Sequence, residues 1–130
     1  MKLATVIAFC LMLVCSAAHA QKPGPNFTPI AEFPVTGQPD KVSVLYSVEW
    51  PPDSVYTLHS HPGDEYGFVT KGAFGIKLID GPWRTYTTGQ AFYVPAGVAH
   101  EHKNMTVSTT TLHQFLVEKD KKLLQPYTKS

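Results

Sequence analysis

Apolar and polar residues alternate along the chain from Lys41 onward. Between Val42 and Trp50 every second residue is a valine or an aromatic residue. This period of two is typical of a β-strand with one buried face. Similar short segments follow, separated by turns rich in proline, glycine and aspartate. We expect strands at residues 41–50, 55–59, 66–70, 73–79, 83–87, 91–94, 100–105 and 106–117.

No window of the sequence carries the apolar stripe of an amphipathic helix. Short strands joined by regularly spaced turns are typical of a sandwich or a closed barrel. The sequence therefore predicts an all-β fold, a single antiparallel β-barrel or jelly roll. A chain of 130 residues is long enough for one such domain and too short for two.

The first twenty residues differ in kind from the rest of the chain. Lys2 precedes an almost unbroken apolar run, Leu3 to Cys15, and the small residues Ala18 and Ala20 follow. This order is that of a secretory signal peptide. We therefore expect residues 1–20 to be a signal peptide cleaved near Ala20, and the mature protein to be exported to a periplasm or to the medium.

Two other interpretations of this segment are weaker. An uncleaved membrane anchor needs about 20 apolar residues to span a bilayer core, and this run is shorter. A lipoprotein anchor at Cys15 calls for small residues before the cysteine, where Leu13 and Val14 stand. No other segment is long and apolar enough to cross a membrane, so we expect no stable membrane insertion. Cleavage would remove both cysteines and leave a mature chain without disulfides.

The balance of charged residues limits the kinds of partner that the protein is expected to bind. Lysines and arginines number 11 against 10 acidic residues, with no basic stripe. Nucleic acid is therefore not an expected partner, whereas a small organic molecule is compatible with the sequence.

Residues 21–40 carry prolines at positions 23, 25, 29, 34 and 39. Because proline lacks a backbone donor, this segment is expected to be an extended arm, able to pack along the barrel.

The candidate chemistry lies near two turns. His59 and His61 are two residues apart in a predicted strand, so their side chains share a face. Glu65 follows the Pro62–Asp64 turn, and Asp64 is expected to be an exposed loop acid. His100 follows a second turn with proline and glycine. Taken singly, the histidine pair is more often two solvated histidines than a metal site, and Glu65 and His100 could be loop residues without a partner.

Taken together, these positions resemble the two sequence motifs of the cupin family. The segment HSHPGDEYGFVTKG, residues 59–72, and the segment GQAFYVPAGVAHEHKN, residues 89–104, keep the family's spacing of histidines, glutamate, glycines, proline and asparagine. The one departure is Asp53, which stands where the first motif opens with a glycine. The resemblance covers residues 41–117. It implies a small antiparallel β-barrel with a metal bound inside it near one mouth.

Carried over from the family, the metal ligands would be His59, His61, Glu65 and His100. Three imidazoles and one carboxylate suit one divalent ion of iron, manganese, nickel, copper or zinc per chain. Four protein ligands would leave positions on an octahedral ion for substrate or solvent.

Strand alternation adds candidates around this site. His102 and Asn104 share the face of His100 if the strand is regular. Glu65 and His102 are the candidate catalytic proton carriers, although His102 could equally be a packed histidine, and Asn104 is expected to support the barrel. His113 could reach the cavity or not. Four aromatic residues could line a pocket but are more often plain core: Tyr46, Tyr56, Tyr86 and Phe92.

The resemblance leaves function open between classes. A metal-dependent enzyme acting on a small organic substrate is the first hypothesis, with dioxygenase-like oxidation favoured over lyase, isomerase or decarboxylase chemistry. A non-catalytic protein of the cell envelope that captures a small ligand through its metal is the second, and a metal store is a weaker third. A homodimer is expected, because cupins commonly pair through barrel edges. The expected organisation is a signal peptide at 1–20, an arm at 21–40, a cupin domain at 41–117 and a tail at 118–130.

Overall fold

The computed structural model describes residues 23–119 and 125–126, and every helix or strand assigned in them is a β-strand. The predicted signal peptide and most of the predicted tail lie outside the described residues. Within them there is no helix of a length and hydropathy that would cross a membrane. The strands are β1 (Asn26–Pro34), β2 (Lys41–Trp50), β3 (Val55–Ser60), β4 (Glu65–Lys71), β5 (Ala73–Leu78), β6 (Trp83–Thr87), β7 (Ala91–Val94), β8 (His100–Asn104), β9 (Thr110–Lys119) and β10 (Gln125–Pro126).

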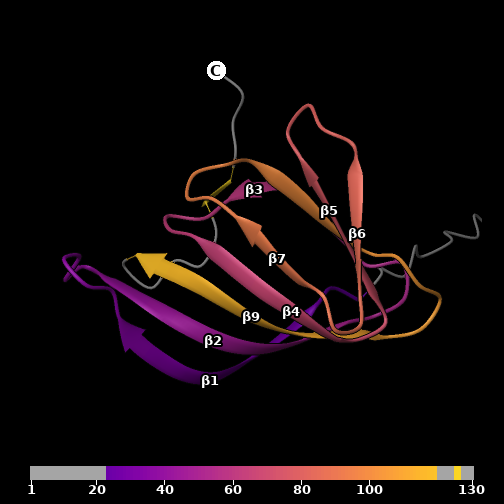
Figure 1. Cartoon of the computed structure of the whole chain (residues 1–130), viewed down its shortest axis with the longest axis horizontal. Coiled ribbons are helices and arrows are strands. Elements are labelled where there is room, and N and C mark those ends of the chain that lie inside the picture. Colours follow the sequence, from indigo (N-terminus) through magenta and orange to yellow (C-terminus); the bar gives the residue numbers. More distant parts are fainter. Residues whose placement is uncertain (1–22, 120–124, 127–130) are drawn as a thin grey trace, which may run out of the picture.

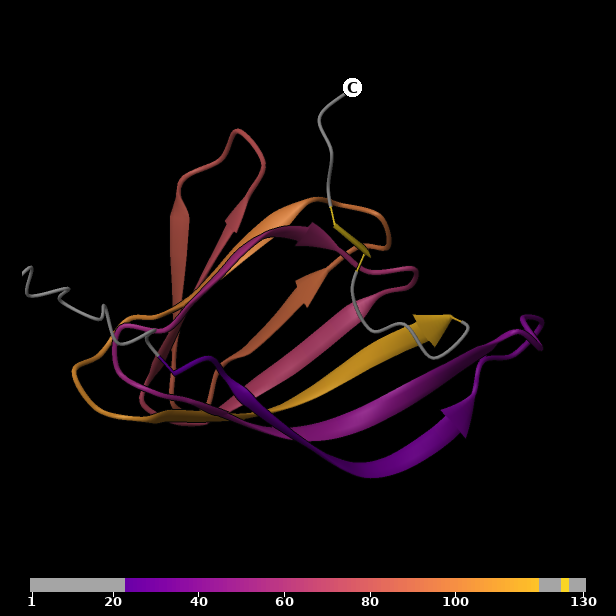
Figure 2. The same cartoon turned by 180° about the vertical axis from the view of Figure 1, so that it is seen from behind.

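The strands form two five-stranded antiparallel sheets. Sheet A has the order β1-β2-β9-β4-β7, and sheet B has the order β10-β3-β8-β5-β6. Figures 1 and 2 show the strands of sheet A side by side in one curved layer, with sheet B as the second layer. Neighbouring strands are mostly distant in sequence, as in a jelly roll. The predicted all-β antiparallel fold is confirmed.

The core lies between the two sheets and follows the alternation of the sequence. Along β2, Val44, Val48 and Trp50 are at most 1% exposed, and Leu112 of β9 and Phe74 of β5 are fully buried. The rings of Trp50 and Phe74 meet edge to face with centroids 4.9 Å apart. Burying side chains of this size drives the two layers together.

The proline-rich segment, expected as an extended arm, supplies β1. This strand pairs with β2 from Asn26 opposite Glu49 to Pro34 opposite Val42, with an irregularity between Pro29 and Ala31. Proline is tolerated here because β1 lies at the edge of sheet A, where one side of the strand has no ladder partner.

The last long strand begins later than expected. It was expected from residue 106, but β9 starts at Thr110. The side chain of Asn104 holds residues 105–109 in a loop, because its Oδ1 accepts from the Thr106 amide at 2.9 Å and its Nδ2 donates to the Ser108 carbonyl at 2.8 Å. The expected supporting role of Asn104 agrees with these contacts.

Candidate metal centre

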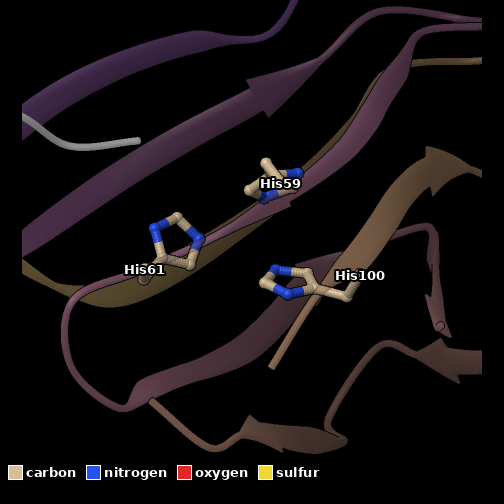
Figure 3. A group of neighbouring side chains, drawn as sticks. All are labelled: His59, His61 and His100. Carbon is tan, nitrogen blue, oxygen red and sulfur yellow. The ribbon is translucent and has the colours of Figure 1, made fainter. Parts of the chain in front are cut away.

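The four expected ligands come from strand ends that meet at one mouth of the barrel. His59 lies near the end of β3 and His61 follows that strand directly. Glu65 opens β4, and His100 opens β8 opposite His59 in the register. Figure 3 shows the three imidazoles facing a common space. All four side chains are buried, with Glu65 and His100 at 0% exposure.

The potential ligand atoms lie close enough to share one ion. Those of His59, His61 and His100 all lie within 4.8 Å of one another, and so do those of Glu65, His100 and His102. Ligands about 2.0–2.2 Å from a common ion are roughly 3–4.4 Å apart. The two groups share His100, so they form one cluster of four histidines and one glutamate.

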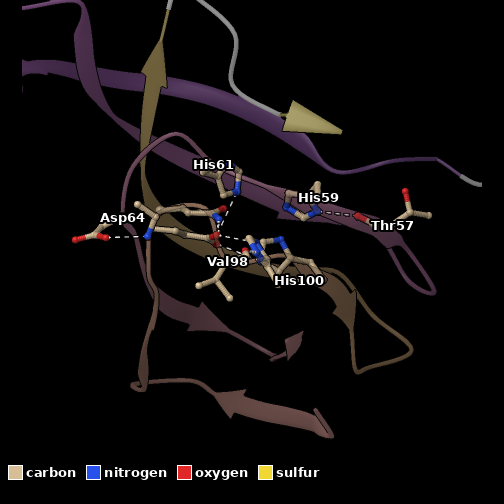
Figure 4. A network of polar contacts seen from close by, with 10 residues as sticks. Thr57, His59, His61, Asp64, Val98 and His100 are labelled. Carbon is tan, nitrogen blue, oxygen red and sulfur yellow. Dashed lines mark hydrogen bonds and ion pairs between the residues drawn. The ribbon is translucent and has the colours of Figure 1, made fainter. Parts of the chain in front are cut away.

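Backbone carbonyls orient two of the imidazoles. His59 Nδ1 donates to the Thr57 carbonyl at 2.7 Å, and His100 Nδ1 donates to the Val98 carbonyl at 2.8 Å (Figure 4). A carbonyl can only accept, so each neutral ring carries its proton on Nδ1 and has its lone pair on Nε2. This is the second contact that metal-binding histidines commonly make.

The loops that carry the ligands are tied to each other. The Ala96 amide donates to Asp64 Oδ1 and the Gly97 amide donates to the His61 carbonyl, each at 2.9 Å (Figure 4). The Tyr66 hydroxyl donates to Asp64 Oδ2 at 3.1 Å. Asp64 is therefore not the freely exposed loop acid that was expected; it is half-buried and links the β3–β4 and β7–β8 loops.

The two oxygens of Glu65 have different surroundings. Oε2 lies 2.9 Å from His100 Nε2 and 3.2 Å from His61 Nε2. Oε1 lies 3.2 Å from His102 Nε2 and accepts a hydrogen bond from the side-chain amide of Gln114. Gln114 was missed by the sequence analysis. Its signal was a polar residue on the inward face of a strand, between Leu112 and Leu116.

The chemistry of these atoms fits a cation. Glu65 Oε2 and His100 Nε2 are both buried, and neither has a partner placed for a hydrogen bond. The two atoms are 2.9 Å apart, but the ring is not oriented for a hydrogen bond between them. A cation bound to both atoms would satisfy them. Three imidazoles with one carboxylate are a donor set for divalent first-row metals.

The protonation states also suit metal binding. Burial, with smaller effects from His102 and His100, lowers the pKa of His59 to about 3. Burial lowers the pKa of His102 as well, although Glu65 opposes this. Burial alone raises the pKa of Glu65, but the nearby imidazoles outweigh it and hold this pKa well below the usual range. At neutral pH His59 and His102 are therefore neutral and Glu65 is a carboxylate, which are the forms that bind a metal.

The other candidates divide between the site and its surroundings. His102 points inward and is 2% exposed, against Glu65. His113 is exposed and does not point into the cluster. Tyr56 contacts the His59 ring at 5.1 Å between centroids, whereas Tyr46 and Phe92 belong to the core and the half-buried Tyr86 packs against it.

Comparison with known families decides the affiliation of the chain. The family described as "Cupin domain" matches residues 46–117, which is more than half of the sequence. The chain belongs to the cupin family. A comparison with curated protein sequences gives no match.

Solved structures agree with this affiliation. A cupin domain from Bordetella pertussis is similar with a TM-score of 0.59 and 17% identity, covering 76% of this chain and 98% of that one. A cupin superfamily protein from Desulfitobacterium hafniense has a TM-score of 0.59 and 13% identity, covering 89% and 97%. At these identities the likeness shows the cupin fold alone. KdgF from a Halomonas species has a TM-score of 0.57 and 27% identity, covering 76% and 84%.

Proposed function

We propose that this cupin is a metal-dependent enzyme acting on a small organic substrate, with one divalent ion per chain held by His59, His61, Glu65 and His100. The observation that carries the proposal is that Glu65 Oε2 and His100 Nε2 lie 2.9 Å apart without a hydrogen bond inside a buried group of imidazoles. A purely structural core would place a donor between such atoms or replace them with apolar groups.

When bound, the ion supplies Lewis acidity or a redox centre at positions left open to a substrate. Dioxygenase-like oxidation is the favoured reaction class, with lyase, isomerase and decarboxylase chemistry as alternatives. Iron, manganese, nickel, copper and zinc all suit the donor set.

His102 is the proposed proton carrier. Its lowered pKa keeps the imidazole neutral at pH 7, so it can accept a proton. Its Nε2 lies 3.2 Å from Glu65 Oε1, so the ring is beside the site. Glu65, the other candidate, is less suited to carry a proton, because its carboxylate is a proposed ligand of the ion.

A cleft of small-ligand size lies beside the loop that joins His61 to Glu65. It has a volume of about 380 Å³ and includes Lys41, Pro62, Asp64, Tyr66 and Val117 in its walls, but none of the proposed ligands. Small organic ligands occupy clefts of about 300–1,000 Å³.

The first test is metal content. Elemental mass spectrometry on the mature protein should find about one equivalent of a divalent metal per chain. The His59→Ala/His61→Ala double variant should lose it while keeping its β-sheet circular dichroism. A folded parent protein that stays free of metal after anaerobic refilling would refute the proposal.

The second test separates an enzyme from a binding protein. Oxygen consumption and product formation should be screened with the loaded protein and a panel of small oxygen-bearing compounds. Turnover that disappears in the double variant supports the enzyme. Tight metal-dependent binding without product would instead support the non-catalytic envelope protein.

We also propose that the protein is exported. The pattern of residues 1–20 supports this proposal. Cell fractionation should find the protein outside the cytoplasm with Gln21 as its first residue. An intact N-terminus in the cytoplasm would contradict it.

A further inference from the structure

The cleft of about 380 Å³ opens on the outer face of sheet A. Its walls include Ser43 of β2 and Val117 of β9, which are partners in the strand register. Both side chains are on the outer face, because their chain neighbours Val44 and Leu116 belong to the core. We call this cleft the outer cleft. It is a different place from the group of buried imidazoles, which lies between the sheets.

A close backbone contact fixes the loop that forms one wall of the outer cleft. A Cβ atom at Gly63 would lie 2.4 Å from the Cβ of Val117, so only glycine allows the loop to come this close. Lys41 Nζ donates to the Pro62 carbonyl at 3.0 Å, and Asp64 is tied to the β7–β8 loop at 2.9 Å. The loop is anchored from both sides, so the outer cleft is preformed, as ligand sites usually are.

The charges in the walls balance. Lys41 and Asp64 are the one cation and the one anion among the wall residues. A ligand with a net charge would be attracted by one of them and repelled by the other, so the walls favour a neutral ligand. The ammonium of Lys41 uses one proton on the Pro62 carbonyl and has two more to donate. The carboxylate of Asp64 has about four lone-pair sites and accepts from the Tyr66 hydroxyl and one backbone amide.

The polar groups of a fitting ligand therefore both accept and donate hydrogen bonds. They accept from Lys41 and donate to Asp64, and a hydroxyl group can do both. Three uncharged polar side chains add to the walls: Gln38, Ser43 and Tyr66. Uncharged partners on several sides suit a ligand with several hydroxyl groups better than one with a single pair of opposite charges.

An exposed aromatic ring adjoins these polar groups. Tyr66 is 49% exposed and lines both the outer cleft and an apolar groove of about 210 Å³. Phe68 and Phe115 line that groove, and Tyr93 packs on Tyr66 with ring centroids 5.1 Å apart. The face of an aromatic ring is negative and attracts polarised C–H groups. A ligand with hydroxyl groups along its edges and C–H groups on its faces would satisfy the cleft and the ring together.

We propose that the outer cleft binds a neutral saccharide, with one sugar ring between Lys41 and Asp64 and the C–H face of the sugar against Tyr66. A further sugar unit extends past Tyr66 into the groove lined by Phe68 and Phe115. The site goes beyond the proposed metal-dependent function and does not rest on it, because none of the proposed metal ligands lines the cleft.

The test is an NMR titration of the ¹⁵N-labelled mature protein with three neutral trisaccharides: maltotriose, cellotriose and chitotriose. At least one should bind with a Kd of about 1 mM or lower and shift the amides of residues 62–66. Tyr66→Ala should weaken this binding about 10-fold, because it removes the stacking surface. Tyr66→Phe keeps the ring and should bind within about 3-fold of the parent protein.

Lys41→Met tests the polar side of the outer cleft. It removes a charged hydrogen-bond donor from a chain of similar length, so binding should weaken about 10-fold. Lys71→Met, at the end of β4, is the matched control for the lysine. Trp83→Ala is the control for the aromatic ring, because Trp83 is 37% exposed on β6 of the other sheet. Both controls should leave the Kd unchanged, and circular dichroism should be the same for all variants compared.

Three results overturn the proposal. The first is that none of the three trisaccharides shifts the amides of the cleft. The second is binding that survives both Tyr66→Ala and Lys41→Met, or that is lost in the two controls. The third is a cleft that takes citrate or glycine in preference to the trisaccharides, because its ligand would then be charged. Zinc-loaded and chelator-treated protein should bind equally, so the result stands apart from that of the metal test.

Discussion

At the residue scale, Glu65 is the most constrained side chain of the centre. Its Oε2 lies near His61 and His100, while its Oε1 accepts a hydrogen bond from the Gln114 amide and lies 3.2 Å from His102 Nε2. A carboxylate with one oxygen occupied in this way presents the other to an ion as a single ligand. Gln114 is therefore assigned a positioning role rather than a place among the ligands.

Replacing Gln114 with leucine tests that role. Gln114→Leu fills similar space but removes the donor to Glu65 Oε1, so the carboxylate is free to rotate. We expect metal affinity to fall about 10- to 100-fold, the usual cost of losing such a contact. Competition with a chelator of known affinity, in the folded variant, measures the change.

The matched control is Gln90→Leu. Gln90 accepts from the Thr87 amide in a surface turn and does not contact the cluster. Its replacement should leave metal affinity unchanged. Equal affinities for the parent protein and Gln114→Leu would show that Glu65 is held without this amide.

The sequence could predict which side chains are the proposed ligands, but not the residue that supports Glu65. His59, His61, Glu65 and His100 are recognisable because their spacing is local to two turns. Gln114 is 49 positions from its partner Glu65. Their contact depends on β4 lying beside β9, and neither strand's own alternation contains that pairing.

At the scale of the elements, the turns explain the glycines of the two motifs. Gly72, Gly89 and Gly97 all have positive φ, at 91°, 88° and 72°. Glycine adopts this conformation without strain. Asp53, which replaces the first motif's opening glycine, has the same kind of backbone with φ at 58°. Aspartate is among the few other residues that tolerate the left-handed region, so the substitution preserves the turn.

Substitutions at Asp53 should follow this backbone constraint. Asp53→Val places a β-branched side chain in the left-handed region and should lower the free energy of unfolding by about 1–2 kcal/mol. Asp53→Gly should stay within about 1 kcal/mol of the parent protein, because relief of strain offsets the greater freedom of the unfolded chain. Urea denaturation of both variants measures the difference. If valine and glycine were equally tolerated, the turn would not be constrained as described.

Strand centres were predictable and some strand ends were not. The period of two located β2 through β8 because alternation reports burial on one face. The start of β9 was misplaced because the side chain of Asn104 controls the loop before it. In the arm, β1 was not expected as a strand of the sheet. Its prolines fit only an edge strand, and the sequence does not show which strand would be its neighbour.

At the scale of the whole molecule, the buried titratable groups make stability depend on pH. The folded protein keeps His59 neutral down to a pKa of about 3, whereas an unfolded histidine binds a proton below about pH 6.5. Between these values the unfolded state holds more protons, so stability falls as pH falls. Below the usual range of a glutamate, the lowered pKa of Glu65 adds to the loss in the same direction.

Chelator-treated protein should therefore be less stable at pH 5 than at pH 7. His59 alone contributes a loss of about 2 kcal/mol over this interval, which corresponds to roughly 10 °C in melting temperature. Thermal melts followed by circular dichroism measure it. His59→Asn should show a smaller decrease between the same pH values, and a flat profile for the parent protein would contradict the assignment of a buried neutral histidine.

The proposed ligands belong to both layers of the molecule. His59 and His100 lie on strands of sheet B, whereas Glu65 lies on sheet A. An ion bound to all of them would link the two sheets by coordination bonds. The layers can then separate only after coordination bonds break, and that separation is the step that opens the core. Besides any role in chemistry, the metal would slow unfolding and so set how long each molecule survives as a folded protein.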